Sequence, residues 1–531
     1  MAVVRRRLLV PATLAALGLV AAACGGDDGE DASTAATVDE GVKSGIESQL
    51  GGSTTTSTSA VEDPTTLEGW EELWSEQRAA IVARIQENGW GLNAEGTQVT
   101  GPEGFTMDLS ACPAGWSNTE GLTDTEIKIG HPTALSGTLA DYGNISRGQI
   151  AILDYYSQEG FFEDSEGKTR SVNMILKDDA YDPARTIPLV DELLDSEKAF
   201  AIQTLGSPST MKVYDKLNQR CVPHPLPITG HPAWGDPVHH PWTTTAGFAY
   251  NTEAVLWGNF IEDLMADEFP DGVKVAALVM NNDFGKSYDS AFKAYIAQSP
   301  NAAKFEFVTE TIEPSAPTVK DPMTTLAAEG ADVFIAMTAG VSCTQAIIEA
   351  AENGMTEDVP YLFMPSTCKA SSFMGKDKVG GDGSASEGWW VFGGGLRDLN
   401  SVAEDGNAFI EWARERVRAI GLDPASSGSF SNGIGNGWAM AQALKIGGEL
   451  DGGLTRTNLI LALRAIDMTN PMLVTGIQFN MNGNADAYVI EGSDVSRWNS
   501  GEQRWVPEGD IIDLSGKSSN CAWDQAAGLC G

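Results

Sequence analysis

Short apolar runs alternate with amphipathic stretches along most of the chain after residue 125. The strand-like runs of the first part cover residues 127–130, 172–176, 200–204 and 225–229. Helical spacing of apolar residues follows them near 145–158, 183–195 and 209–219. Strands that alternate with helices predict right-handed βαβ units in a parallel sheet.

The same alternation restarts after residues 242–245. Strand-like runs cover residues 273–279, 305–308, 333–336 and 361–363, and helices are predicted near 252–266, 286–297, 319–329 and 342–353. We therefore predict an α/β fold of two doubly wound parallel-sheet lobes joined by several crossings of the chain. Such a fold places a ligand at the carboxyl ends of the strands, where loops from both lobes converge.

The first residues have the pattern of a targeting segment. Arg5, Arg6 and Arg7 precede an apolar stretch over residues 8–20, and three alanines stand directly before Cys24. This pattern predicts a signal peptide over residues 1–23. The end of the segment is similar to a bacterial lipobox, which implies a lipid on Cys24 and a chain held at the cell membrane, outside the cytoplasm. Because the lipobox position usually occupied by leucine is Ala21, cleavage by the ordinary signal peptidase is the alternative.

The region between Cys24 and the first lobe has two parts. Residues 24–63 are predicted to be a lipidated cysteine and a disordered Ser/Thr-rich tether, because their apolar content is too low to fold. A capping-box pattern at Thr65 and Glu68 then begins a helix, so residues 64–124 are predicted as an N-terminal helical extension. The apolar stripe of that helix, which we expect to pack on its own domain, is Leu67, Trp70, Trp74, Ile81 and Ile85.

Charge narrows the possible partners. The chain carries 73 Asp+Glu against 34 Lys+Arg, a formal net charge of −39. Such a surface repels phosphate backbones, so we predict no nucleic-acid partner. No later apolar run approaches the ~18 residues that a membrane span needs. Contact with the membrane is therefore predicted only through the lipid anchor.

Cysteine usage indicates disulfides. Apart from Cys24 the chain has six cysteines: Cys112, Cys221, Cys343, Cys368, Cys521 and Cys530. An even number in an oxidising compartment predicts three bridges, among about 15 possible pairings. Cys521 and Cys530 are close enough to close a short loop. Cys343 should begin a helix after one second-lobe strand and Cys368 should follow the next strand, so we expect a bridge that rigidifies two neighbouring loops.

Patterns of catalysis and metal binding are missing from the sequence. It contains no GxSxG, HExxH or GxxxxGK[ST] motif, and the glycine run at 433–437 lacks GxGxxG spacing. His231, His239 and His240 share one loop with Asp236, but their spacing matches no standard metal-ligand pattern. We predict that the protein is not an enzyme and holds no metal and no cofactor.

Six motifs together resemble the type I periplasmic binding proteins, specifically the leucine/isoleucine/valine-binding group that serves ATP-binding cassette (ABC) importers. The motifs are Ile-Lys-Ile-Gly at 127–130, Leu-Ser-Gly-Thr-Leu-Ala at 135–140, Lys-Asp-Asp at 177–179, Gly-Ser-Pro-Ser-Thr at 206–210, Asn-Asp-Phe-Gly at 282–285 and Phe-Asn-Met-Asn-Gly at 479–483. Their order and spacing carry the resemblance, which covers residues 125–500.

This resemblance implies an architecture and a function. The expected N-lobe comprises residues 125–248 plus 390–478, and the expected C-lobe comprises 249–389 plus 479–531. The expected function is capture of a small polar solute of the amino acid, carboxylate or amide class in the interlobe cleft, with delivery to ABC permease subunits. A ligand-sensing receptor that signals through a membrane partner uses the same fold and is the alternative.

The resemblance also implies site residues. The turn at 206–210 would grip an electronegative group through hydroxyls and free N–H groups, although a plain helix N-cap is its other interpretation. Aromatic residues from the two lobes would enclose the ligand. The predicted ligand-binding set is Ser136, Tyr142, Ser207, Ser209, Thr210, Gly230, Phe284, Thr338, Ala339 and Ser366. Residues 364–367 hold no acid to pair with an ammonium, so a carboxylic acid, an amide or another neutral polar solute fits better than an amino acid.

Overall fold

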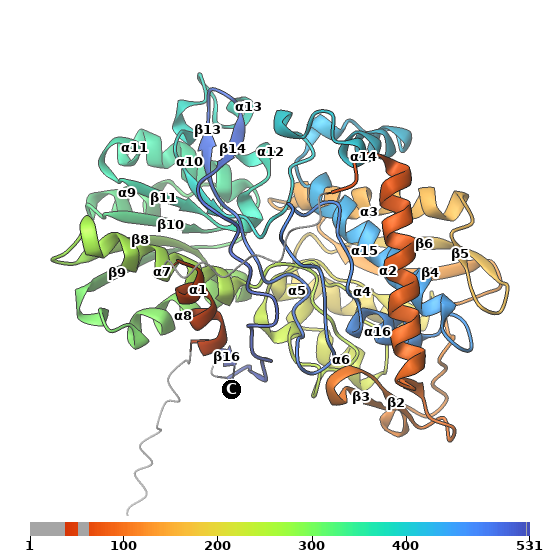
Figure 1. Ribbon diagram of the computed structural model, residues 1–531. Coiled ribbons are helices and arrows are strands. Elements are labelled where there is room, and N and C mark those ends of the chain that lie inside the picture. Colours follow the sequence, from red (N-terminus) through yellow and green to blue (C-terminus); the bar gives the residue numbers. More distant parts are fainter. Residues whose placement is uncertain (1–37, 51–62, 527, 531) are drawn as a thin grey trace, which may run out of the picture. The chain divides into compact units, whose positions relative to one another are not determined.

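The computed structural model of the protein describes residues 38–50, 63–526 and 528–530 (Figure 1). The predicted signal peptide, Cys24 and much of the predicted tether lie outside the described residues. The described part contains two α/β lobes, and each lobe is built on a sheet with parallel strands. We call the elements that pack on the four-stranded sheet the first lobe, and those that pack on the seven-stranded sheet the second lobe.

The first lobe is built on a sheet of order β5-β6-β4-β7, in which β4 pairs in parallel with β6 and β7 and β5 is an antiparallel edge strand. The strands are β4 (Glu126–Thr133), β5 (Phe162–Glu163), β6 (Thr169–Asp178) and β7 (Ala201–Ile202). Helices α3 (Gly143–Gln158), α4 (Pro183–Asp195) and α15 (Phe430–Glu449) belong to this lobe. Helix α4 begins where sequence rules place it, with Asp182 as N-cap and Pro183 at the first helical position.

The second lobe is built on a sheet of order β14-β13-β12-β11-β10-β8-β9. Its strands are β8 (Val273–Met280), β9 (Phe305–Ile312), β10 (Val333–Met337), β11 (Tyr361–Met364), β12 (Trp390–Phe392), β13 (Val495–Asn499) and β14 (Arg504–Pro507). Strands β8 to β12 are parallel, and β13 and β14 add an antiparallel edge. Helices α7 (Tyr250–Asp267), α8 (Asp283–Gln298), α9 (Lys320–Ala328) and α10 (Val341–Glu352) accompany the sheet. The two sheets confirm the α/β fold prediction.

The shorter helices lie in the connections. They are α5 (Ser207–Met211), α6 (Tyr214–Gln219), α11 (Met355–Asp358), α12 (Ser371–Met374), α13 (Lys376–Val379), α14 (Ala408–Ala419) and α16 (Arg456–Arg464). The predicted helix at 209–219 is therefore divided into α5 and α6. The predicted strand at 225–229 is replaced by isolated β-bridges, in which Ile228 pairs with Leu205 and His224 pairs with Thr243. Pro223, Pro225 and Pro227 lack the N–H groups that a ladder requires, which explains this difference.

The chain crosses between the lobes three times. The first crossing leads from Thr245 into α7, the second follows β12 at Gly393–Gly395, and the third precedes β13 at Ser493 and Asp494. The crossings are hydrogen-bonded to one another. Val489 N–H donates to Thr245 Oγ1 (2.9 Å), and Gly394 N–H donates to Ser493 Oγ (3.1 Å). The three crossings therefore form one continuous joint between the sheets.

Helix α1 (Glu40–Leu50) corrects part of the tether prediction. Val38, Val42 and Ile46 are buried, and their spacing of four residues forms one apolar stripe. The helix lies beside α7, and Asp513 N–H donates to Gln49 Oε1 (2.9 Å). Three aliphatic side chains suffice to order this segment because a neighbouring helix covers them.

The predicted N-terminal extension contains more than a helix. Helix α2 (Leu67–Glu87) buries Trp70, Trp74, Ile81 and Ile85, as its stripe predicts, but its N-cap is Thr66 rather than Thr65. A small antiparallel sheet follows, with β1 (Gly91–Leu92), β2 (Gln98–Thr100) and β3 (Thr106–Asp108). None of the helices in the described ranges has the length and hydropathy of a membrane span.

Three disulfides join all six predicted cysteines. Cys112 pairs with Cys221, Cys343 with Cys368 and Cys521 with Cys530, at Cα–Cα distances of 5.6, 5.8 and 4.8 Å. The expected Cys343–Cys368 bridge is confirmed. The third bridge closes the C-terminal hairpin of β15 (Trp523–Asp524) and β16 (Leu529–Cys530).

Candidate functional site

A cavity of about 150 Å³ lies where the two lobes and their crossings meet. The first lobe contributes Tyr142, Tyr181, Gly230, Asn432 and Asn436 to its wall, and the second lobe contributes Tyr250, Phe284, Ala339, Ser366 and Thr367. Phe248, Gly393, Gly394 and Ile490 line it from the crossings. A cavity of this volume accommodates a molecule the size of benzene.

Tyr142 connects the two lobes across the cavity. It ends the 3-10 turn Ala140–Tyr142 directly before α3, and its phenol oxygen accepts a hydrogen bond from Gly340 N–H (3.0 Å). The same hydroxyl donates to the carbonyl of Thr367 (3.1 Å). Burial raises the pKa of Tyr142, so the phenol keeps its proton at neutral pH. Both partners of this phenol are backbone groups of the second lobe.

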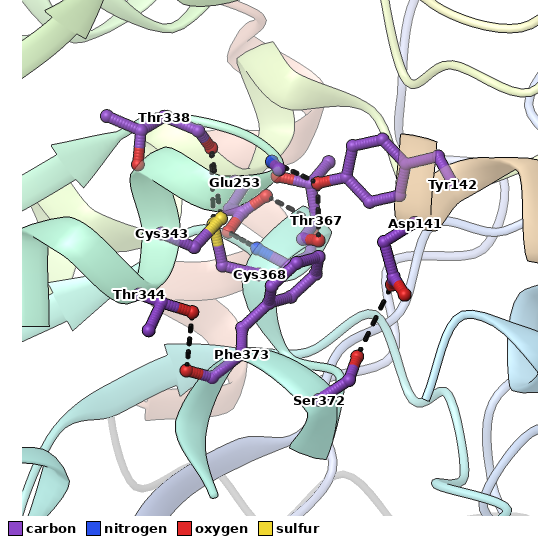
Figure 2. Close-up of a disulfide and its surroundings, with 12 residues drawn as sticks. Asp141, Tyr142, Glu253, Thr338, Cys343, Thr344, Thr367, Cys368, Ser372 and Phe373 are labelled. Carbon is purple, nitrogen blue, oxygen red and sulfur yellow. Dashed lines mark hydrogen bonds between the residues drawn. A yellow bond between two sulfur atoms is a disulfide. The ribbon is translucent and has the colours of Figure 1, made fainter. Parts of the chain in front are cut away.

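A disulfide ties together the two loops that Tyr142 contacts (Figure 2). Cys343 lies in the first turn of α10, three residues after Gly340, and Cys368 directly follows Thr367. Phe373, from the short helix α12, meets the Tyr142 ring edge-on at a centroid distance of 5.8 Å. The disulfide therefore fixes the distance between the Gly340 N–H group and the Thr367 carbonyl, the two groups that bind the Tyr142 hydroxyl.

Two aromatic rings of the second lobe form the apolar wall. Phe284 stands in the first turn of α8, where Asn282 caps the helix by accepting from Gly285 N–H (3.2 Å). Its ring meets Tyr250 edge-on at 5.1 Å, and Tyr250 stacks on Tyr288 at 4.7 Å. The pairs hold Phe284 and Tyr250 in place against the cavity.

Tyr181 reaches the cavity through an unusual backbone conformation. Ala180 and Tyr181 have φ values of +52° and +62°, which side-chain-bearing residues rarely adopt. Asp179 Oδ1 accepts the N–H of Tyr181 (2.8 Å) and stabilises the turn. A Cβ on Gly206 would lie 2.1 Å from the Tyr181 ring, so only glycine permits this position. Sequence reasoning missed Tyr181 as a lining residue because nothing in the sequence signals the strained turn.

Helix α15 presents two amides to the cavity that sequence reasoning also missed. Asn432 and Asn436 are one turn apart and both line the cavity. On another side of the helix, a Cβ on Gly433 would lie 2.9 Å from Gly148 Cα, so α15 packs with its backbone close to α3. The sequence signal for these two residues is the run rich in glycine and asparagine at 432–437. This run lacks GxGxxG spacing and was therefore not assigned to the site.

Five of the ten predicted ligand residues line the cavity: Tyr142, Gly230, Phe284, Ala339 and Ser366. The other five, Ser136, Ser207, Ser209, Thr210 and Thr338, do not. Of the predicted anchor turn at 206–210 only Gly206 lines the cavity, and the ligand-binding role of the turn stays a prediction.

The hydroxyls of the predicted anchor have partners inside the first lobe. Ser209 Oγ donates to Asp179 Oδ2 (3.2 Å), Ser207 Oγ bonds Thr229 Oγ1 (2.8 Å), and Thr210 Oγ1 donates to the carbonyl of Gly206 (2.8 Å). Ser136 Oγ donates to Asp178 Oδ2 (2.7 Å) on the exposed side of the turn. Thr338 is buried, and its Oγ1 has no hydrogen-bond partner among the described residues. The hydroxyls of Ser136, Ser207, Ser209 and Thr210 are therefore engaged within the first lobe.

We therefore expect Ser209→Ala to affect stability rather than binding. The substitution leaves the buried oxygens of Asp179 and Thr186 without one partner, which should lower the free energy of unfolding by about 1–3 kcal/mol. Urea unfolding and calorimetric titration with a bound solute measure the two effects. Ser110→Ala, which removes an exposed hydrogen bond to Asp108, is the control and should change neither. A weaker affinity at unchanged stability would restore Ser209 as a ligand residue.

Glu253 stands behind Ser366 and fixes its loop. Glu253 Oε1 accepts from Ser366 N–H (2.7 Å), and Oε2 accepts from Ser366 Oγ (2.7 Å) and from the Tyr288 hydroxyl (2.6 Å). Burial raises the pKa of Glu253 to about 8, against the lowering effect of these hydrogen bonds. At pH 7 this carboxyl is largely protonated, so it places little negative charge behind the cavity.

The histidine loop forms an ion-pair cluster away from the cavity. Asp236 contacts His239 Nδ1 (3.0 Å) and His240 Nδ1 (3.2 Å), and His240 Nε2 contacts Asp215 Oδ1 (2.8 Å). Burial lowers the pKa of His231 to about 3. Within the described residues no group of three or more His, Cys, Asp or Glu side chains is arranged to hold a metal ion.

His240 should make stability depend on pH. Partial burial lowers its pKa, but the hydrogen bonds and charges of Asp236 and Asp215 outweigh burial and leave the pKa above its ordinary value of 6.5. A raised folded-state pKa gives stability that is complete below the unfolded pKa and is lost as pH rises through the folded one. The difference in unfolding free energy between the native protein and His240→Gln should therefore be about 1–3 kcal/mol at pH 5.5 and smaller at pH 8.5, measured by urea unfolding. A difference that grows with pH would contradict this.

The comparisons with known proteins agree with this geometry. Residues 126–501 match a family model described as periplasmic binding protein. No curated protein sequence matches the chain significantly.

Solved structures of low sequence identity share the fold. A fatty acid ABC transporter substrate-binding protein from Thermomonospora curvata is 19% identical, with a TM-score of 0.59 over 75% of this chain and 95% of that one. A branched chain amino acid ABC transporter protein from Thermus thermophilus with bound valine is 13% identical, with a TM-score of 0.61 over 73% and 97%. A solute binding protein from R. palustris in complex with benzoate is 19% identical, with a TM-score of 0.57 over 76% and 99%.

The family match covers most of the chain, and it includes all three crossings and every strand of the two lobe sheets except β14. It confirms the prediction of a binding protein rather than an enzyme. The chain belongs to the periplasmic binding protein family.

Proposed function

We propose that this protein captures a small polar solute in the cavity between its lobes and delivers it to the permease subunits of an ABC importer. The observation that carries the proposal is the cavity of about 150 Å³, which both lobes line and Tyr142 spans. The fold shared with ABC transporter proteins that hold valine and benzoate supports it. The leucine/isoleucine/valine specificity stays a prediction.

Capture would work through lobe closure. The solute contacts side chains of both lobes, so it binds the closed form better than an open one and shifts the population toward closure. The three hydrogen-bonded crossings would act as the joint about which the lobes move. Gly394 and Gly395, at φ +59° and +72°, give the second crossing a conformation that glycine adopts without strain. The closed surface formed by both lobes is then the feature that a permease can recognise.

The proposal includes the location of the protein. A lipid on Cys24 would hold it at the outer face of the cell membrane, and residues 25–37 would separate the lipid from helix α1. The predicted lobe boundaries, 125–248 plus 390–478 and 249–389 plus 479–531, belong to the same proposal.

A ligand screen on the mature chain tests the proposal. Thermal shift against small amides, carboxylic acids, amino acids and sugars should reveal a binder, and calorimetry should give an affinity near micromolar, about −8 kcal/mol. Small-angle scattering should show a smaller radius with the ligand. Gly435→Leu, which fills the cavity beside Met472, should abolish binding, whereas Gly501→Leu on the exposed β13–β14 turn should not. A folded protein that binds no compound of the screen would contradict the proposal.

A further inference from the structure

The cavity lining carries no ionised side chain. None of the described residues that line it is Asp, Glu, Lys, Arg or His. Two ionisable groups behind the wall have partners of their own. Lys369 lies behind Gly393, where a Cβ would be 2.2 Å from its Nζ, and this ammonium bonds both oxygens of Asp494 at 3.0 Å. Glu253 shares its oxygens with Ser366 and Tyr288. A charged ligand would therefore be buried without a counter-charge, which is unfavourable.

The polar side chains that line the cavity are hydroxyls and neutral amides. Asn432 and Asn436 project from α15, and Asn470 adds a third amide whose Oδ1 accepts Met472 N–H (3.0 Å). Asn436 Nδ2 donates to the carbonyl of Asn432 (2.9 Å), and its Oδ1 accepts no hydrogen bond from the described part of the chain. The Asn432 side chain forms no hydrogen bond with the described part of the chain. An asparagine offers both a donor and an acceptor, so it matches a carboxamide on both of its groups.

The remaining lining residues limit the size and shape of the apolar part of a ligand. Tyr250 and Phe284 line the cavity from the second lobe, whereas Asn432 and Asn436 line it from α15 of the first lobe. The volume of about 150 Å³ limits the apolar part to roughly one ring or a branched aliphatic group. The site therefore combines a neutral polar end on α15 with an aromatic enclosure on the second lobe.

We propose that the ligand is an electrically neutral molecule of about one ring that bears a carboxamide, and that Asn432 and Asn436 bind this amide. The proposal rests on the proposed function and specifies its substrate class. It departs from the ligands of the structural neighbours, because valine is a zwitterion and benzoate is an anion. Asn436 is the residue whose lack of charge should set the specificity.

A set of three probes of the same shape tests the charge requirement. Benzamide, benzoate and benzylamine share one ring and differ at pH 7 in being neutral, anionic and cationic. Calorimetric titration of the mature full chain should show benzamide binding at least tenfold more tightly than either charged compound. Equal or tighter binding of benzoate or benzylamine would overturn the proposal.

The other outcomes separate this proposal from the proposed function. If another solute binds but none of the three probes does, the ring-sized amide class is wrong and solute capture stands. If the folded protein binds nothing in the wider screen, both proposals fail.

A charge-reversing variant tests the role of Asn436. Asn436→Asp should weaken benzamide at least tenfold and strengthen benzylamine at least tenfold, because it supplies the missing counter-charge. Asn88→Asp makes the same chemical change at the exposed end of α2 and should alter neither affinity. A purely structural Asn436 would weaken both probes together in the variant, and that result would overturn the assignment.

Discussion

Replacing Lys369 by methionine should lower the free energy of unfolding by about 3–5 kcal/mol, because it strands a buried carboxylate. Lys369 and Asp494 have side chains that are 8% and 9% exposed, and Lys369 Nζ lies 3.0 Å from both carboxylate oxygens. Asp494 also accepts from Gly395 N–H (2.9 Å) and Ser496 Oγ (2.7 Å). The ion pair thus links the loop after β11 to two of the three crossings.

The pH dependence of this loss gives a second readout. Burial raises the pKa of Asp494, but the Lys369 ammonium and the hydrogen bonds outweigh burial and hold it below the usual range. A carboxyl with a depressed folded-state pKa contributes stability above its unfolded pKa and loses it as pH falls through the folded one. Without Lys369 the carboxyl can protonate at higher pH, so the difference between the native protein and Lys369→Met should shrink on acidification.

The matched control is an exposed ion pair. Lys293 bonds Asp289 at 2.7 Å on α8, and its side chain is 54% exposed. Lys293→Met should therefore cost less than about 1 kcal/mol. Urea unfolding at pH 7 measures both variants. A Lys369→Met protein as stable as Lys293→Met would show that the crossings do not depend on this pair.

Strand positions were predicted best for strands that are buried on both faces of the sheet. Strands β8 and β10 are covered on both faces, so they read as continuous apolar runs, and their positions were predicted within a few residues. The Cys343–Cys368 bridge followed from the same logic, because adjacent parallel strands end at one edge of a sheet. Patterns that depend on one element and its immediate neighbour could be predicted.

The candidate site was less predictable, because the hydrogen-bond partner of a serine or threonine hydroxyl depends on tertiary contacts. Ser209 and Thr210 stand at a helix start, as expected, but Asp179 and Gly206 take their hydrogen bonds. Asn432 and Asn436 lie on α15, and no sequence motif predicted them as ligand residues. The φ of Tyr181 and the docking of α1 are set by Gly206 and α7, which lie far from them in sequence. In each case the deciding partner is distant in the chain.

Removing the Tyr142 hydroxyl should strongly weaken the affinity for a bound solute. Tyr142→Phe keeps the ring against Phe373 but removes the hydroxyl that joins the lobes. In the closed form Gly340 N–H and the Thr367 carbonyl would lose this partner, at a cost of about 1–3 kcal/mol. An open form exposes both groups to water and bears no such cost. We therefore expect the affinity for a bound solute to fall about 5–150-fold, measured by calorimetry.

Two measurements distinguish a weakened closed form from a damaged fold. Small-angle scattering at saturating ligand should show a larger radius for Tyr142→Phe than for the native protein, because closure is less favourable. Tyr361→Phe removes a phenol that donates to Glu268 (2.8 Å) at an exposed position of the second lobe, and it should bind as the native protein does. Thr138 adds its own links across the lobes, donating to the Pro314 carbonyl (2.8 Å) and accepting Val341 N–H (3.3 Å), so closure should be weakened rather than lost. Unchanged affinity in Tyr142→Phe would mean that the other contacts between the lobes, including those of Thr138, suffice for closure and that the Tyr142 hydroxyl contributes nothing to capture.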